Sequence, residues 1–164
     1  MKKLDNLVQD FLAQKNIAVV GVSDKRETGC NLTYKKFKEN GYTVHAVNPR
    51  LSTYDGVPCY PDLRSIPDKP DAVFIFASPR VTEQIVQQCV DLGINHVWMH
   101  CIMGTKPGLV PGMTSVSQSA VETCRANGIA VIPGSCPVQF LKPDLGHAMM
   151  WGLWQAFGFM SVPN

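Results

Sequence analysis

Five short apolar runs constrain the fold of this 164-residue chain more than any other feature. Their apolar residues are consecutive rather than alternating with polar ones, which is typical of strands that are buried on both faces. The five runs are Ile17–Val22, Thr43–Val47, Ala72–Ala77, His96–Cys101 and Ile129–Ile132. Since parallel strands need long crossover connections, the intervals between these runs should hold helices.

Helical spacing and end signals occur between the runs. The expected helices are Lys2–Lys15, Leu32–Asn40, Pro79–Leu92, Thr114–Asn127 and Asp144–Met160. The interval after the second run, "NPRLSTYDGVPCYPDLRSIPDKPD", is predicted to be a long loop with one helical turn near Asp62–Ile66. This order predicts an α/β fold: a doubly wound, Rossmann-like parallel sheet of about five strands, with helices on both faces and the first strand central.

The composition narrows the class of protein. Residues 1–164 are expected to form one domain, with an N-terminal helix in residues 1–15 and an apolar C-terminal helix in residues 144–160. A net charge of +2 gives no reason to expect a nucleic-acid partner. The N-terminus has no signal-peptide pattern and no apolar run could span a bilayer, so a cytoplasmic location without a membrane partner is expected. The six cysteines lack a CxxC pair, which predicts reduced thiols and no metal site.

Ligands of such sheets bind outside the carboxyl ends of the strands, so the residues just past each run are the informative ones. They are Gly21-Val22-Ser23, Asn48-Pro49-Arg50, Ala77-Ser78-Pro79-Arg80, His100-Cys101-Ile102 and Pro133-Gly134-Ser135-Cys136-Pro137. Because parallel strands point the same way, all five sets should lie along one edge of the sheet.

The loop after the first strand, "GVSDKRETGCN", matches the dinucleotide fingerprint only in part. A G-x-G-x-x-G pattern would place glycines at positions 21, 23 and 26, and the chain has only Gly21. The Ser23 hydroxyl can still donate to a phosphate, and Lys25 or Arg26 can neutralise one. The first amides of the next helix, near Asn31–Thr33, would add partial positive charge. The alternative is a strand-to-helix turn without a ligand.

The ends of the second and third strands separate the nucleotide classes. An NAD site needs a carboxylate after the second strand, but this chain has Asn48-Pro49-Arg50 there. An arginine suits a phosphorylated ribose, as in NADP or coenzyme A, unless Pro49 and Arg50 simply form a solvated turn. Ser78-Pro79 is the expected cap and first residue of a helix, whose amides could also meet an adenine or a pantetheine amide.

Longer motifs show a family resemblance. The segments "AVVGVSDKRETG", "GYTVHAVNPR", "GVPCYPDLRSIPDKPDAVFIFASP", "HVWMH" and "GIAVIPGSCP" occur in the order found in small standalone CoA-binding domain proteins. These proteins are similar to the CoA-binding Rossmann domain of the succinyl-CoA synthetase alpha subunit. The resemblance covers roughly Asn16 to Pro137.

The resemblance implies that coenzyme A or an acyl-CoA lies across the strand ends. It would place the diphosphate at Gly21, Val22 and Ser23, beside charged loop residues at Lys25 and Arg26. The ribose phosphate and adenine would lie at Pro49 and Arg50, with Ala77, Ser78 and Pro79 on the adenine side. The synthetase also has a second domain with a phosphorylated catalytic histidine, which 164 residues are too few to include, so ligase activity is not implied.

Two rival functions are also compatible with the sequence: an NADP-dependent oxidoreductase and a protein-interaction module. No residue is assigned to catalysis, because His100 and Cys101 are neighbours on a strand and should point to opposite faces. A mixed disulfide between coenzyme A and Cys30 or Cys136 is a further hypothesis, and the role of Cys101 stays open. The last helix carries His147 among Met and Trp residues, which favours a buried helix or a homodimer contact.

Overall fold

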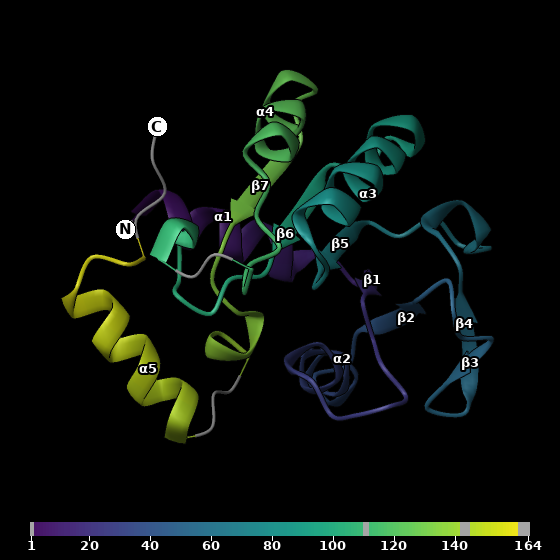
Figure 1. The fold of residues 1–164 in the computed structure, drawn as a ribbon, viewed down its shortest axis with the longest axis horizontal. Helices are drawn as coiled ribbons and strands as arrows, with labels where there is room; N and C mark the ends of the chain where they lie inside the picture. The colour runs from purple at the N-terminus through teal and green to yellow at the C-terminus, as the bar shows by residue number, and fades with distance from the viewer. Residues whose placement is uncertain (1, 110–111, 142–144, 161–164) are drawn as a thin grey trace.

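The computed structural model describes residues 2–109, 112–141 and 145–160. Within these residues the protein is an α/β fold built on a seven-stranded, mostly parallel sheet (Figure 1). The strands are β1 (Asn16–Val20), β2 (Thr43–Val47), β3 (Thr53–Tyr54), β4 (Val57–Tyr60), β5 (Ala72–Ile75), β6 (His96–Met99) and β7 (Ala130–Pro133). Their order across the sheet is β3-β4-β2-β1-β5-β6-β7, so the first strand is central, as expected.

The expected number of about five strands is wrong, because the segment assigned to a loop contains two more. Asp55 and Gly56 both have left-handed backbones, with φ of 51° and 74°, and they connect β3 to β4 as a tight antiparallel hairpin. β4 then pairs in parallel with β2. Strands of two and four residues are too short to show a hydrophobic period. The expected helical turn is confirmed as a 3₁₀ turn, η1 (Leu63–Ser65).

The sheet grows outward from β1 in both directions, toward β2 on one side and β5 on the other. Six of the seven described strands run in parallel, and β3 alone is antiparallel. The carboxyl ends of these six strands therefore share one edge, as the sequence predicts. The loops after β1 and β5 leave this edge toward opposite faces of the sheet, which opens a crevice between them.

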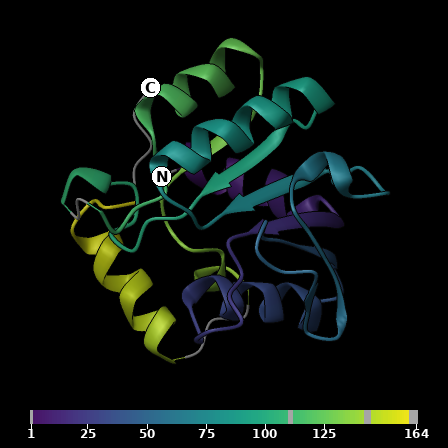
Figure 2. The same cartoon turned by 45° about the vertical axis from the view of Figure 1, so that its right-hand side comes forward.

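Helices cover both faces of the sheet (Figure 2). α1 (Lys2–Ala13) and α2 (Gly29–Glu39) pack on one face, in a core that includes Phe11, Phe37 and Trp98. α3 (Pro79–Leu92) and α4 (Gln118–Ala126) pack on the other face, against side chains such as Val97 and Met99. α3 has the expected bounds. α2 starts three residues earlier than expected and α4 four residues later, because Thr28 and Ser117 provide the side-chain caps.

The last helix, α5 (Leu145–Ala156), lies at the periphery of the molecule, apart from the sheet (Figure 1). It contacts the 3₁₀ turn η3 (Pro137–Gln139), whereas a third such turn, η2 (Pro107–Leu109), lies in the loop after β6. None of the residues of α5 is buried, so the prediction of a helix buried within this chain is wrong. Asp144, the expected first residue, lies outside the described residues. No described helix is both long and apolar enough to cross a membrane.

Candidate functional site

Gly21 ends the central strand at the edge where the candidate site lies. Its φ is +109°, a conformation that side chains disfavour, and a Cβ atom there would lie 2.0 Å from the carbonyl oxygen of Phe76. The turn is held between the neighbouring strands, since the Gly21 N–H donates to Val47 O at 2.9 Å. The Phe76 N–H in turn donates to Val20 O at 2.9 Å. Only glycine fits this position, which agrees with its expected role in the tight turn.

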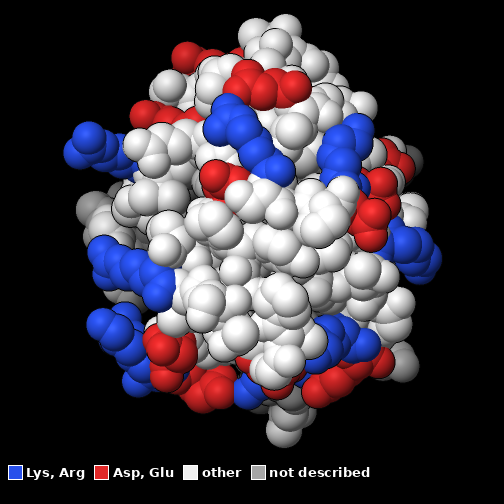
Figure 3. Space-filling view, turned by 90° about the vertical axis from the view of Figure 1, so that its right-hand side faces the viewer, with Lys and Arg blue, Asp and Glu red and all other residues white. Residues whose placement is uncertain are grey.

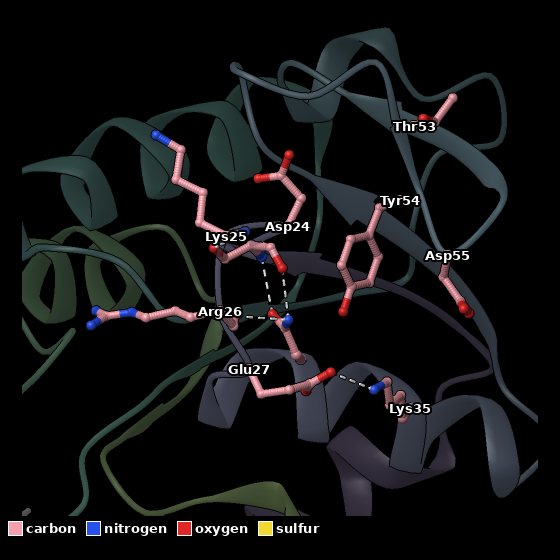
Figure 4. A pocket seen from close by; sticks show the side chains of 10 residues that line it. Asp24, Lys25, Arg26, Glu27, Lys35, Thr53, Tyr54 and Asp55 are labelled. Carbon is pink, nitrogen blue, oxygen red and sulfur yellow. Dashed lines mark hydrogen bonds and ion pairs between the residues drawn. The ribbon is translucent and has the colours of Figure 1, made fainter.

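The loop that follows Gly21 is organised by Asn31, a residue that sequence reasoning placed only among helix amides. The buried Asn31 side chain accepts hydrogen bonds from the Ser23 N–H at 3.0 Å and from the Thr28 hydroxyl at 2.9 Å. Its amide group donates to Ser23 O at 2.7 Å and to Arg26 O at 3.4 Å (Figure 4). One side chain therefore fixes the loop from Ser23 to Thr28. The spacing Thr28-x-x-Asn31 at a helix start is the signal that could have identified it.

The loop after β2 is tied to the loop after β1 through Asn48. The Asn48 side chain donates to Val22 O at 2.7 Å and accepts from the Arg50 N–H at 2.8 Å. Asn48, the neutral residue found where an NAD site has a carboxylate, thus uses its side chain for hydrogen bonds to the backbone. Pro49 and Arg50 follow it on the exposed surface at the end of β2.

The start of α3 forms the opposite side of the crevice. Ser78 occupies the cap position without a side-chain cap bond, and Pro79 is the first helical residue, as expected. The Ala77 N–H donates to the Ser115 hydroxyl at 2.9 Å, and the Thr82 hydroxyl donates to Ser115 O at 2.7 Å. Ser115, which lies on the segment before α4, therefore holds the end of β5 in place.

Two cavities open at this edge of the sheet, on either side of Arg26. The hairpin cavity, about 480 Å³, lies between the loop after β1 and the β3–β4 hairpin. It is lined by Ser23, Asp24, Lys25, Arg26, Glu27, Asn31, Lys35, Thr53, Tyr54 and Asp55. The strand-end cavity, about 530 Å³, lies at the ends of β5 and β6. It is lined by Arg26, Phe76, Ala77, Ser78, Pro79, His100, Ile102, Gly112, Met113, Thr114 and Ser115.

The predicted site residues divide between these two cavities. Ser23, Lys25 and Arg26 line the hairpin cavity, whereas Ala77, Ser78 and Pro79 line the strand-end cavity together with Arg26. The other four predicted residues, Gly21, Val22, Pro49 and Arg50, line neither. Val22 is fully buried, so only its backbone could face a ligand.

Two cations of the loop after β1 are available to an anion. Glu27 pairs with Lys35 at 2.7 Å, and Asp55 pairs with Lys38 at 2.6 Å. Lys25 and Arg26 form no ion pair with any described residue, and their side chains extend away from Tyr54 and Asp55 (Figure 4). A phosphate at this loop would meet the two cations and one carboxylate, that of Asp24, which lines the same cavity and forms no ion pair with a described residue either.

On the face shown in Figure 3, lysines and arginines alternate with acidic residues around an uncharged middle. Neither sign of charge forms a continuous surface on this face. The charge distribution seen there does not have the basic stripe that nucleic-acid binding proteins present. In the described part of the chain, no three His, Cys, Asp or Glu side chains are grouped to hold a metal ion.

His100 forms part of the strand-end cavity wall, but Cys101 does not. The His100 ring lies against Phe76, with 4.4 Å between ring centroids, and burial lowers the pKa of the imidazole to about 4. Cys101 is almost fully buried. The two side chains therefore do not form a catalytic pair, as the alternation of strand residues predicts.

The thiols named in the mixed-disulfide hypothesis are inaccessible. Cys30 is fully buried and Cys136 is 7% exposed. The Cys30 thiol donates a hydrogen bond to Val20 O at 3.6 Å. Burial raises the pKa of this thiol far above the usual range. Since the thiolate is the nucleophile in disulfide exchange, this environment makes Cys30 unreactive.

His100 is expected to make the protein less stable as the pH falls from 6.5 to about 4. The folded protein keeps the ring neutral over this range, whereas the unfolded chain binds a proton below pH 6.5, which favours unfolding. The loss should be on the order of 2–3 kcal/mol and should level off below the folded pKa. Urea unfolding at several pH values checks this, with His100→Gln as the reference that lacks the effect. A His100 ring that titrates near pH 6.5 in NMR spectra would contradict it.

These observations define a class of protein: an α/β domain with ligand-sized cavities at the carboxyl ends of a mostly parallel sheet. The sequence specifies the family within that class. Residues 15–141 match the CoA binding domain family, and the chain belongs to it. The resemblance to CoA-binding domain proteins that the sequence motifs indicate is thereby confirmed.

Two curated relatives come from Archaeoglobus fulgidus. The chain is 32% identical to acetate–CoA ligase (ADP-forming) I over 122 residues, which is 74% of this chain and 18% of the ligase. It is 28% identical to acetate–CoA ligase (ADP-forming) II over 90 residues, which is 53% of this chain and 13% of that ligase. The chain thus spans less than a fifth of the length of these ligases.

Solved structures share the fold. A hypothetical protein from Pyrococcus horikoshii has 27% identity and a TM-score of 0.71, with 85% of this chain and 92% of that chain covered. A dinucleotide-forming acetyl-coenzyme A synthetase from Ca. Korarchaeum cryptofilum has 21% identity and a TM-score of 0.56. That match covers 70% of this chain and 25% of the synthetase, and it supports the fold alone.

Proposed function

We propose that this protein binds coenzyme A or an acyl-CoA across the carboxyl ends of its strands, as a Rossmann-like domain without catalysis of its own. The observation that carries the proposal is the strand-end cavity, which lies between the loop after β1 and the start of α3 in a chain of the CoA binding domain family. In an α/β sheet this crevice is where nucleotide ligands bind.

The loop from Ser23 to Arg26 suits the diphosphate. The Ser23 hydroxyl oxygen accepts from the Lys25 N–H at 3.2 Å, which leaves its own proton free to donate to a ligand. Lys25 and Arg26 supply the charge. The Ser23 N–H is committed to Asn31, so the phosphate would rely on these side chains and on the first amides of α2, which starts at Gly29.

The strand-end cavity suits pantetheine, which is uncharged. Its wall combines apolar side chains, among them Phe76, Ile102 and Met113, with the hydroxyl of Thr114. At neutral pH His100 adds an uncharged ring, because its pKa is lowered by burial. Pro49 and Arg50 would then receive the phosphorylated ribose and the adenine, whereas the turn from Ala77 to Pro79 lines the cavity that receives pantetheine. Apart from Arg26, which borders both cavities, the strand-end cavity has no charged side chain in its wall at neutral pH, which matches an uncharged pantetheine.

The other readings receive less support. Neither the family nor the ligase relatives point to an NADP-dependent oxidoreductase or to a protein-interaction module. Among the lining residues of the strand-end cavity, only Arg26 and His100 carry ionisable side chains. A hydride-transfer site would need an acid or base that stays functional near pH 7. The activity of the complete ligases is not transferred to a chain that matches so small a share of them.

Thermal unfolding with coenzyme A, acetyl-CoA, NADP and NAD tests the proposed function. A ligand at about 100 times its dissociation constant should stabilise the protein by about 2.7 kcal/mol. Coenzyme A or acetyl-CoA should give this stabilisation, and NAD should give none. Stabilisation by NADP without any by coenzyme A would overturn the proposal. Identification of a co-purified ligand by mass spectrometry provides an independent check.

Arg50→Glu is expected to weaken coenzyme A at least tenfold, because a charge reversal beside the 3′-phosphate replaces attraction by repulsion. Dephospho-coenzyme A, which lacks that phosphate, should be affected less. Isothermal titration calorimetry of both ligands measures the difference. Arg125→Glu is the matched control, since Arg125 lies in the last turn of α4, at the other edge of the sheet. Equal losses for the two ligands would show that Arg50 does not contact the 3′-phosphate.

A further inference from the structure

The outward face of α5 is an uncharged apolar surface that nothing in the described chain covers. Residues with helical spacing form it: Leu145, Ala148, Met149, Gly152, Leu153 and Ala156, all exposed. The inward positions, among them Met150 and Trp154, are only partly exposed. The Trp154 ring N–H donates to Ile102 O at 3.1 Å, which holds this inward side on the domain. The helix therefore has a defined orientation, with its apolar stripe turned to solvent.

The area of this surface is enough for a small dimer contact. Leu145 is 78% exposed, Met149 62%, Leu153 52% and the following Phe157 67%. With about 150–250 Å² for a fully exposed large side chain, the exposed apolar area is about 400–650 Å². This is at the upper end of the ~300–600 Å² that the largest patch of a monomer covers, and two copies would together bury about 800–1,300 Å², near the ~1,000 Å² that a specific interface needs.

Gly152 gives a second, independent indication of a closely packed neighbour. Glycine weakens a helix interior, and no contact within the described chain requires this one, because an added Cβ would meet none of the described atoms within 4 Å. Its backbone does not need a positive φ either. Ala148, Gly152 and Ala156 form a line of small residues between larger ones, which lets another helix approach closely.

The chemistry of the stripe favours a second copy of this chain as the partner. No residue of α5 carries a formal charge, so the stripe offers nothing to a charged partner or to an anionic membrane surface. A small cavity of about 290 Å³, lined by Asp5, Gln139, Phe140, Ala148 and Trp151, opens along one flank of the stripe, and Met149 and Leu153 protrude on the other flank. In a two-fold symmetric dimer each copy supplies both the protruding side chains and the cavity, so the same contact forms twice.

We infer that the protein forms a homodimer in which the apolar stripes of two α5 helices pack against each other across Gly152. This goes beyond the proposed function and does not depend on it, since no residue of the stripe lines the hairpin cavity or the strand-end cavity. The contact is isologous. It buries the exposed leucines and methionine of both copies and leaves the crevices at the sheet edges open to ligand.

Sedimentation equilibrium over a concentration series tests the inference. The wild-type protein should have twice the 18.0 kDa mass of the chain at micromolar concentrations. Leu153→Glu should raise the dissociation constant of the dimer at least a hundredfold, because it places a charge in the contact. Val57→Glu, the same kind of change at a half-exposed residue of the β3–β4 hairpin, should leave the dimer intact. Coenzyme A binding, measured in parallel, should not change in Leu153→Glu.

Gly152→Ala distinguishes an effect on dimer packing from an effect on the stability of the helix. It should raise the melting temperature of the dissociated chain, because alanine favours the helix, and yet weaken the dimer at least tenfold. A wild-type protein that stays monomeric at 100 times these concentrations would overturn the inference. So would a dimer that Leu153→Glu leaves intact. A monomer that binds vesicles of neutral phosphatidylcholine would assign the stripe to a lipid surface instead.

Discussion

Gly21→Ala is expected to lower the free energy of unfolding by about 3–5 kcal/mol and to abolish coenzyme A binding. The added methyl group would lie 2.0 Å from the carbonyl oxygen of Phe76, which belongs to the chain just past a central strand and cannot move freely. Relief of the clash would separate the ends of β1 and β5, the two strands between which the crevice opens. Urea unfolding and calorimetric titration measure the two effects.

Gly41→Ala is the matched control for this variant. Gly41 also has a left-handed backbone, with φ of +83°, but a Cβ there would meet nothing within 4 Å. Only the backbone strain is then added, which should cost about 1–2 kcal/mol and leave coenzyme A affinity unchanged. If both variants lose the same stability, the close approach of Gly21 to Phe76 does not hold the turn.

Asn31→Ala is expected to weaken coenzyme A at least tenfold and to lower the free energy of unfolding by about 2–3 kcal/mol. The change removes four side-chain hydrogen bonds that fix the loop from Ser23 to Thr28. The loop would then have to be ordered by the ligand, and the ordering cost would reduce affinity. Calorimetry should show a larger entropic penalty for the variant.

Asn40→Ala and Asn31→Asp complete this experiment. Asn40 ends α2 and donates one hydrogen bond, to Lys36 O at 2.8 Å, so its loss should cost about 1 kcal/mol without an effect on binding. Asn31→Asp keeps the accepting oxygen but turns the donor into a carboxylate beside two carbonyl groups and the expected diphosphate. It should bind at least as weakly as Asn31→Ala. Wild-type affinity in either Asn31 variant would show that the loop is not preorganised by this residue.

The sequence predicted most of the secondary structure, because the signals involved are local. Continuous apolar runs located five parallel strands, and Pro79 and Gly93 located both ends of α3. The β3–β4 hairpin was missed because its strands are too short to show a period. Its Asp55-Gly56 turn was the available signal.

Only the part of the candidate site that has a local sequence signal was predicted. Ser23, Lys25 and Arg26 were identified from the loop composition, and they line a cavity. Phe76 and Ser115 were not identified, although both line the strand-end cavity. Ser115 reaches the site through a contact with Ala77, 38 residues away, and no local pattern records such a contact.

By itself the sequence determined the α/β class, the common edge of the strand ends and, through its longer motifs, the CoA binding domain family. These follow from hydrophobic period, turn residues and motif order, which are properties of neighbouring residues. Only the tertiary structure decided which loops meet at Arg26, that the cysteines are buried and that α5 turns an apolar stripe to solvent. These depend on packing between segments far apart in the chain, where burial and long-range contacts outweigh local preference.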